Sequence, residues 1–193
     1  MEIILASASP RRRDILDAAK IPYRVCPSMA DESYSEEIAA EMVPELLARR
    51  KALSVSKDAA PDTVVIGADT VVIADGMLLG KPRCEEDAVC MLRALSGKSH
   101  AVISGIAVVR GDTCLSASVR TEVFMRQIRE EEIRAYVKRD KPFDKAGAYG
   151  IQEAAGLFVE RIEGDYYNVV GLPLCALGEL LSQMGVPLFE EEA

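Results

Sequence analysis

The apolar positions of this chain form two kinds of pattern that alternate along its length. Short runs rich in β-branched residues predict strands at residues 2–5, 22–27, 63–66, 70–73, 100–128 (a long hairpin) and 157–164. Longer stretches with helical spacing predict helices at residues 10–20, 36–57 (with a break near Pro44), 85–97, 129–139 and 172–185. Turn signals at Asp75-Gly76 and Gly111-Asp112 indicate antiparallel hairpins. We therefore expect an α/β fold with a mixed, curved sheet flanked by helices.

The composition suits one compact domain and disfavours two classes of partner, nucleic acid polymers and membranes. The 193 residues are 49% hydrophobic, without an internal repeat or linker, so we expect a single domain over residues 1–193. The net charge of −8 disfavours binding to a nucleic acid polymer. No apolar run approaches the ~20 residues of a membrane span, and the first residues lack the basic region of a signal peptide. We expect no membrane contact.

The thiols and the single imidazole are expected to have no catalytic role. The five cysteines are scattered, odd in number and free of C-x-x-C spacing, which favours reduced thiols in a cytoplasmic protein over zinc ligands or disulfides. His100 lies in a predicted strand, and one histidine alone completes neither a zinc site nor a serine triad, so we interpret it as structural. The acidic tail at residues 189–193 is expected to fray.

The start of the first predicted helix, within the stretch SASPRRRDIL at residues 7–16, carries an unusual charge. Ser9 is placed as the N-cap, and a proline follows it in the first turn. Arg11, Arg12 and Arg13 come next, although a helix N-terminus already carries about half a positive charge. A bound anion would make this cluster favourable, because the helix amides and the guanidinium groups would bind the same charge.

Other polar residues stand where a ligand could use them, and each also has an ordinary structural explanation. Asp69 interrupts an apolar run, where a carboxylate is costly unless a metal, a cation or a reaction uses it, but a solvent-facing strand position would look the same. Lys81 follows the second run in a segment that fails the P-loop spacing, so a solvated turn is the alternative. Glu32 and Lys51 are equally compatible with solvated surfaces. Gln152 offers a donor and an acceptor that suit either a base edge or a loop cap.

Taken together, these groups indicate hydrolysis of a nucleotide phosphoanhydride. The arginines at the helix start suit a polyphosphate. A pair of carboxylates can hold a divalent cation against those phosphates. Lysines can absorb the charge that develops on a leaving group.

The same residues carry a resemblance to a known family. The motifs that carry it occur in this order: LASASPRR (5–12), ADES (30–33), ARRKA (48–52), GADTVV (67–72), LGKP (79–82), DKAGAYGIQ (144–152) and GDYYNVVGLP (164–173). The ordered set resembles the Maf, or septum-formation, family of nucleoside triphosphate pyrophosphatases. It covers essentially the whole chain and is far more specific than any one motif.

The resemblance implies a fold related to the inosine triphosphate pyrophosphatases, with two lobes and a central cleft. It implies that a nucleoside triphosphate is cleaved between its α- and β-phosphates to the monophosphate and diphosphate (pyrophosphate). A divalent metal, Mg²⁺ or Mn²⁺, would be required. A homodimer is compatible with the family, although no feature of this sequence proves one.

The resemblance also implies residue roles. Phosphate contacts are implied for Ser7, Ser9, Arg11 and Arg12. Asp69 is implied as general base, metal ligand or both, with Glu32 as the second carboxylate and metal ligand. Lys51 and Lys81 would stabilise developing charge. Substrate specificity is implied for Arg12, Thr70 and Gln152.

The segment DKAGAYGIQ resembles the branch of the family that acts on dTTP and UTP, and modified pyrimidine triphosphates are compatible with it. One departure is that Glu153 stands where the family usually has glycine. A positive φ at Glu153 would cost about 1 kcal/mol or more. Two alternatives stay open: a nucleotide-binding regulator of cell division with little catalysis, and a pyrophosphatase with a different base preference.

Overall fold

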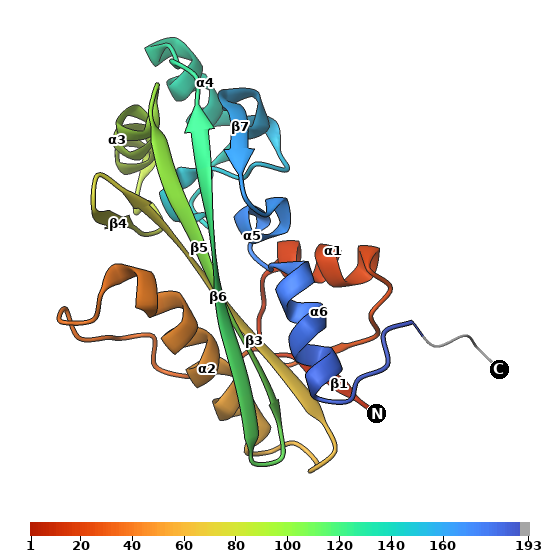
Figure 1. The fold of residues 1–193 in the computed structure, drawn as a ribbon. Helices are drawn as coiled ribbons and strands as arrows, with labels where there is room; N and C mark the ends of the chain where they lie inside the picture. Colours follow the sequence, from red (N-terminus) through yellow and green to blue (C-terminus); the bar gives the residue numbers. More distant parts are fainter. Residues whose placement is uncertain (190–193) are drawn as a thin grey trace. The chain divides into compact units, whose positions relative to one another are not determined.

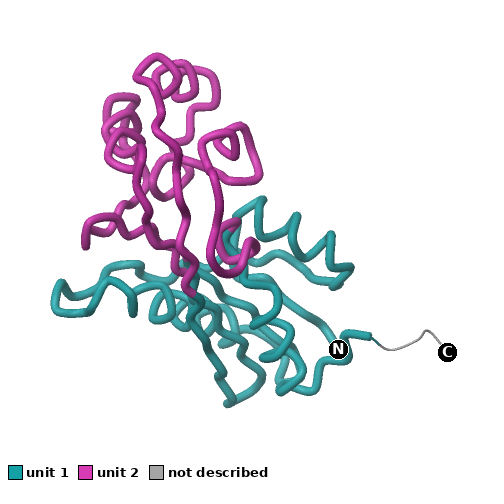
Figure 2. The backbone as a smooth tube through the Cα atoms, turned by 45° about the horizontal axis from the view of Figure 1, so that its top comes forward, with its two compact units in different colours: residues 1–69, 104–119, 171–193 teal, residues 70–103, 120–170 magenta. Residues whose placement is uncertain are grey.

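The structure, a computed structural model, describes residues 1–189 and divides into two compact units (Figure 2). Unit 1 comprises Met1–Asp69, Ser104–Val119 and the described part of Gly171–Ala193. Unit 2 comprises Thr70–Ile103 and Arg120–Val170. The predicted cleft between two lobes stays a prediction.

The strands form one mixed sheet (Figure 1). Its strands are β1 (Ile3–Leu5), β2 (Arg24–Val25), β3 (Val64–Ala74), β4 (Met77–Leu79), β5 (Ser99–Arg110), β6 (Thr113–Met125) and β7 (Val159–Glu163). The order is β2-β1-β3-β5-β6-β7, with β4 paired to β3. β1 runs parallel to β2 and β3, whereas β3 with β4 and β6 with β7 are antiparallel. The prediction of a mixed sheet is confirmed.

The helices alternate with these strands as predicted. They are α1 (Pro10–Ala18), α2 (Val43–Ser56), α3 (Glu85–Leu95), α4 (Glu130–Asp140), α5 (Tyr166–Val170) and α6 (Leu174–Gln183). Three 3₁₀ segments are η1 (Ala40–Met42), η2 (Ala146–Ala148) and η3 (Ala154–Phe158). Within unit 1, α2 lies on one side of the strands and α1 and α6 lie on the other (Figure 1). Within unit 2, α3 packs against α4.

Two boundaries differ from the prediction. Residues 36–39 form a turn instead of a helix, because the hydroxyl and carbonyl of Ser35 accept the amides of Glu37 and Ile38. α2 begins beside Pro44, which lacks an amide hydrogen and therefore suits a first helical turn. The apolar runs on either side of Asp69 are a single continuous strand, β3.

One core cluster of unit 1 is built mainly on small side chains. It joins Ile4, Ala6, Ala48, Ala52, Val65, Ala107 and Val109. Alanines on α2 allow the helix axis to approach β3 closely. This close approach places the polar side chains of α2 within reach of the strand.

Unit 2 has its own core, in which α3, α4 and η3 contribute Leu92, Ile133 and Phe158. His100 is buried in this unit at 3% exposure, and its Nε2 lies 2.7 Å from the hydroxyl oxygen of Tyr149. Burial lowers the pKa of His100 to about 4, so the ring is neutral at physiological pH. This agrees with a structural role for His100.

Other expectations concern the thiols, the membrane and the tail. All five cysteines are free thiols. None of the described helices has both the length and the apolar character needed to cross a bilayer. Most of the acidic tail, residues 190–193, lies outside the described residues.

Candidate active site

The N-terminus of α1 places serine and arginine side chains together in unit 1. Ser7 lies between β1 and α1, and its Oγ accepts hydrogen bonds from the Ser9 amide at 3.3 Å and from Arg12 Nη1 at 2.9 Å. Ser9 is the N-cap residue, as predicted, but within residues 1–189 its side chain makes no capping hydrogen bond. Arg11 and Arg12 are half-buried whereas Arg13 is exposed, so the three arginines differ in environment.

Arg12 is the most constrained of these cations. Its Nε donates to the carbonyl oxygen of Gly171 at 2.8 Å, which ties the first turn of α1 to the segment before α6. Burial lowers the pKa of Arg12, and the charge of Arg11 acts in the same direction. The carboxylates of Asp69 and Glu32 oppose that shift, so both lie close enough to act on the guanidinium. Arg12 therefore links the helix start to the predicted carboxylate pair.

Lys51 joins the two carboxylates. Its Nζ lies 2.7 Å from Asp69 Oδ1 and 2.8 Å from Glu32 Oε1. The side chains of Lys51 and Asp69 are 12% and 15% exposed, whereas that of Glu32 is 63% exposed. Lys51 and Asp69 are thus shielded from solvent, whereas Glu32 is accessible to it. The attraction between Lys51 and Asp69 is therefore less screened by water than that between Lys51 and Glu32.

Gly67 explains why Lys51 reaches Asp69. A Cβ on Gly67 would collide with the carbonyl oxygen of Ala48 and would lie 2.8 Å from the amide nitrogen of Ala52. Alternate residues of a strand share a face, so Asp69 points to the same side as Gly67, toward α2. Lys51 lies between Ala48 and Ala52 in sequence and projects onto Asp69. The missing side chain at position 67 therefore makes the ion pair possible.

The carboxylate pair determines which kind of metal site the chain can offer. Among the described residues, no cluster of three or more Asp, Glu, His or Cys side chains could enclose a metal ion. Mg²⁺ in phosphate-processing sites is commonly held by one or two carboxylates together with substrate phosphates. Glu32 and Asp69 fit that arrangement and do not fit a cage made of protein ligands alone.

Unit 2 holds the other predicted site residues, beginning with Thr70 and Lys81. Thr70 opens the unit directly after Asp69, and both are less completely buried than the residues on either side of them in β3. Lys81 is exposed and follows β4. Gly80, which precedes it, accepts the amide of Gly147 at 3.1 Å. The end of β4 is therefore attached to the segment that carries Gln152.

Gln152 is exposed and lies in a tight turn. The amide of Glu153 donates to the carbonyl oxygen of Gly150 at 3.1 Å, which encloses Gln152 within the turn. Glu153 has φ −111° and ψ −163°, so the positive φ that would cause strain at this position does not occur. Extended backbone accommodates any side chain. The Glu153 carboxylate instead pairs with Lys145, at 3.2 Å.

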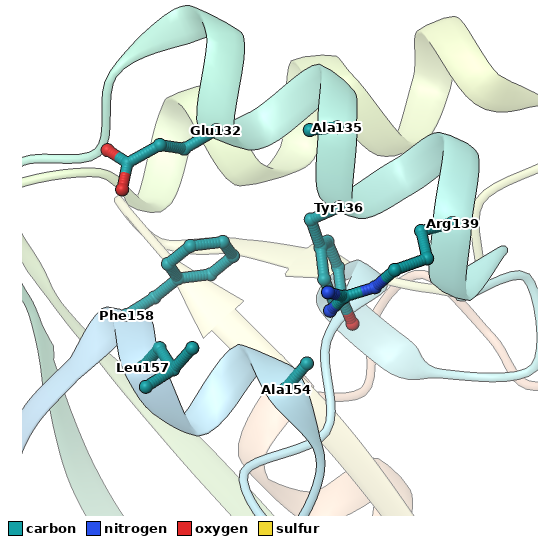
Figure 3. Close-up of a pocket in the computed structure, with 7 residues that line it drawn as sticks. All are labelled: Glu132, Ala135, Tyr136, Arg139, Ala154, Leu157 and Phe158. Atoms are coloured by element: carbon teal, nitrogen blue, oxygen red, sulfur yellow. The ribbon is translucent and has the colours of Figure 1, made fainter.

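A separate hollow of about 230 Å³ lies in unit 2 between α4 and η3 (Figure 3). It is lined by Glu132, Ala135, Tyr136, Arg139, Ala154, Leu157 and Phe158. None of the predicted site residues contributes to this lining. The predicted chemistry therefore does not belong to this hollow.

Sequence reasoning assigned no role to Gly171 or Lys145. Gly171 has φ +125° and presents its carbonyl oxygen to Arg12. Lys145 is buried at 8% exposure, between carboxylates. Both residues lie inside motifs that carry the family resemblance. Their position within a motif is the feature of the sequence that could have indicated a role for them.

Comparisons with known proteins agree with the residue pattern. The chain matches the family described as Maf-like protein over residues 2–184. A Geobacillus sp. (strain WCH70) protein named dTTP/UTP pyrophosphatase is 46% identical over 184 residues, covering 95% of this chain and 98% of that protein. A protein of the same name from Symbiobacterium thermophilum is 47% identical over 189 residues, covering 97% and 96%. One from Thermosipho africanus is 46% identical over 186 residues, covering 96% and 95%.

Two solved structures share a weaker likeness. A nucleoside-triphosphatase, or dITP/XTP pyrophosphatase, from Mycobacterium abscessus has a TM-score of 0.41 and 17% identity, covering 66% of this chain and 76% of that one. The Staphylococcus aureus Ham1 protein has a TM-score of 0.41 and 14% identity, covering 65% and 72%. The sequence relatives align over nearly their whole length and the family match spans residues 2–184, so the chain belongs to the Maf-like protein family.

Proposed function

We propose that this protein is a nucleoside triphosphate pyrophosphatase that hydrolyses dTTP and UTP to the monophosphate and pyrophosphate. The observation that carries the proposal is the cluster in unit 1, where Lys51 bridges Asp69 and Glu32 beside the half-buried side chain of Arg12. Relatives that are 46–47% identical and named dTTP/UTP pyrophosphatase support the choice of substrate.

The start of α1 is proposed to bind the phosphates. Helix amides and guanidinium groups both favour an anion, and within the described residues the Ser9 side chain makes no capping hydrogen bond, so its hydroxyl can donate to one. Arg11 and Arg12 would donate to phosphate oxygens, together with the hydroxyls of Ser7 and Ser9. The fixed direction of Arg12, held by Gly171 and Ser7, favours a defined position of the triphosphate.

Asp69 is proposed to act on the water that attacks the α-phosphorus, as general base, as metal ligand or as both. Lys51 holds Asp69 Oδ1 and thereby orients the carboxylate, leaving Oδ2 for water or metal. As negative charge spreads over the phosphate oxygens in the transition state, the Lys51 ammonium is proposed to stabilise it. Lys81 of unit 2 is proposed to stabilise charge on the departing pyrophosphate.

A divalent cation, Mg²⁺ or Mn²⁺, would be held by Glu32 and Asp69 together with substrate phosphates. When bound, it would neutralise phosphate charge and lower the pKa of coordinated water. The exposed side chain of Glu32 can move toward such a cation, whereas Asp69 is fixed by Lys51.

Base recognition is proposed for Thr70 and Gln152 of unit 2, with Arg12 as the third specificity residue. The Gln152 amide offers both a donor and an acceptor, which matches the alternating carbonyl and N–H groups of thymine and uracil. A site that hydrogen-bonds one base edge rejects a base with a different edge, because its polar groups are left unpaired.

A panel of triphosphates tests this function. Purified protein with Mg²⁺ or Mn²⁺ is expected to release pyrophosphate from dTTP and UTP faster than from dCTP, CTP and the purine triphosphates. Lys81→Ala is expected to lower kcat by at least ~100-fold. Tight nucleotide binding without pyrophosphate release would favour a regulator of cell division, and another order of substrates would assign a different base preference. A homodimer, a cytoplasmic location and a single domain over residues 1–193 stay predictions.

A further inference from the structure

A buried lysine lies in the same segment as Gln152. Lys145 is 8% exposed, and its Nζ lies 2.9 Å from Asp144 Oδ1 and 3.2 Å from Glu153 Oε2. A lysine this deeply buried is rare unless it is paired, and here both partners are carboxylates from its own segment. The contacts therefore hold residue 145 to residue 153 across the turn that carries Gln152.

Lys145 contacts both ends of that turn. At one end, a Cβ on Gly150 would lie 3.1 Å from Lys145 Cε and 3.4 Å from Gln152 Oε1, so the lysine stem and the Gln152 amide flank the same point. At the other end, the carboxylate of Glu153 pairs with the Lys145 ammonium. The Glu153 amide closes the turn onto the Gly150 carbonyl. Gln152 is thus exposed to solvent, whereas its neighbours Gly150 and Glu153 are both in contact with Lys145.

The segment is also anchored from behind. Tyr149, next to Gly150, is 6% exposed and its hydroxyl lies 2.7 Å from His100 Nε2. Tyr136 extends from α4 opposite Ala154 of η3 (Figure 3). Burial raises the pKa of Tyr136, and the charge of Glu153 adds to the shift, so Glu153 lies near this hydroxyl. The flanking residues are thus anchored, and the conformation of the turn itself depends mainly on the contact between Lys145 and Glu153.

We propose that the Lys145–Glu153 ion pair positions the Gln152 amide and thereby sets which base the enzyme prefers. This inference rests on the proposed pyrimidine triphosphate activity. Lys145 and Glu153 are positioning residues, since both act through Gln152. Lys145 is buried but the Glu153 side chain is 39% exposed, so solvent screens their attraction and the pair contributes more to a defined geometry than to stability. Loss of either partner releases the turn and lets the Gln152 side chain sample several rotamers.

A direct contact between Lys145 and a substrate phosphate is the competing explanation. It makes a different prediction, because every nucleoside triphosphate carries the same phosphates. Loss of such a contact would lower kcat/KM equally for all bases. Loss of a positioning contact changes the ratio between bases.

The test measures kcat/KM of the full-length protein for dTTP, UTP, dCTP and CTP. Lys145→Met, Glu153→Gln and the double variant are compared with Lys138→Met and Glu160→Gln, which remove the same charges at exposed positions of unit 2. We expect each single variant to lower the dTTP-to-dCTP ratio about five- to tenfold, the scale of one lost hydrogen bond in a recognition site. The double variant is expected to lower it no further, because the two residues act as a unit.

Four results would overturn the inference: an unchanged ratio, an equal loss for all four substrates, additive losses in the double variant, or a wild-type ratio near one. Thermal unfolding of each variant identifies misfolding, and Glu153→Gln, at a half-exposed side chain, keeps the test valid if Lys145→Met does not fold. If the wild type hydrolyses none of the four, the proposed function fails. Binding of dTMP and dCMP to the wild type and the same variants is then measured by calorimetry. A dTMP-to-dCMP affinity ratio that falls in the variants supports the positioning role of the pair, and an unchanged ratio overturns it.

Discussion

Lys51 Nζ lies 2.7 Å from Asp69 Oδ1, and both side chains are largely shielded from solvent. The lysine comes from α2 and the aspartate from β3, so the pair depends on the packing of a helix against a strand. Glu32 and Arg12 extend the same cluster, and its cations balance its carboxylates before any substrate arrives. A triphosphate that enters together with a divalent cation therefore adds much less negative charge to this cluster than a triphosphate alone.

Replacing Lys51 with methionine is expected to lower kcat about 100-fold or more, because a preorganised cation beside the reacting phosphate is lost. The methionine fits the space of the lysine stem but leaves the shielded Asp69 carboxylate without its cation, so the thermal midpoint is expected to fall as well and activity is compared at a temperature where the variant is folded. Lys57→Met, an exposed position at the C-terminus of α2, serves as the control and is expected to be neutral. Steady-state pyrophosphate release measures both variants, and full activity of Lys51→Met would contradict the role given to the bridge.

Replacing Arg12 with lysine tests the two hydrogen bonds that its guanidinium group donates at the start of α1. The single ammonium of a lysine cannot reach the Gly171 carbonyl and the Ser7 hydroxyl at once, as the guanidinium does. We expect KM for dTTP to rise about tenfold with a smaller change in kcat, the signature of lost ground-state binding. Arg13→Lys, at an exposed position of the same turn, provides the matched comparison. Equal kinetics for the two variants would place the phosphates elsewhere.

The close contact between β3 and α2 leads to a prediction about stability. Gly67→Ala adds a Cβ against the Ala48 carbonyl and the Ala52 amide, both of which belong to the helix backbone. We expect this overpacking to lower the free energy of unfolding by about 1–3 kcal/mol and to move Lys51 away from Asp69, which lowers activity. Urea unfolding measures the first effect.

Gly80→Ala is the control for that experiment. A Cβ at Gly80 meets nothing within 4 Å, and its φ is not in the left-handed region. The expected change in stability is within about 0.5 kcal/mol. Similar losses in Gly67→Ala and Gly80→Ala would show that contact with α2 is not the cause.

Much of the fold could be predicted from periodicity, and the failures have local causes. Asp69 divides an apolar run, yet β3 continues through it, because a carboxylate paired with a lysine can lie in a nearly buried strand. The helix expected from residue 36 is replaced by a turn, because Ser35 competes for the backbone amides. The five-residue helix α5 is too short to produce a periodic signal.

The predicted site residues could be proposed from the sequence, but their mutual geometry could not. Nothing in the spacing of Glu32, Lys51 and Asp69 shows that one ammonium joins both carboxylates. The strain expected at Glu153 depended on a φ value that only the backbone reveals. The partnership of Glu153 with Lys145 is likewise a tertiary contact, invisible to local pattern.

His100 makes stability depend on pH. Burial lowers its pKa in the folded state to about 4, below the ordinary value of 6.5, so the unfolded chain binds more protons between these values. Stability is therefore lost as pH falls from 6.5 toward 4, by roughly 2 kcal/mol between pH 7.5 and pH 5.

The matched variant for this effect is His100→Gln. It is expected to be less stable than wild type at pH 7.5 but to lose the part of the pH dependence that His100 causes. Glu132, whose pKa is lowered to about 2 by the Arg126 and Arg129 side chains, loses its contribution below about pH 4.5 and does not interfere in this window. Urea unfolding at the two pH values measures the difference, and parallel losses in both proteins would assign the titration to another group.

The release of pyrophosphate from dTTP by wild type and by Asp69→Asn tests the central claim most directly. Asparagine keeps the size of the side chain but removes the charge that accepts a proton or binds a cation. We predict equimolar dTMP and pyrophosphate from the wild type and a kcat at least ~100-fold lower for the variant, with an unchanged fold by circular dichroism. Turnover of Asp69→Asn close to that of wild type, or release of inorganic phosphate and dTDP by the wild type, would contradict it.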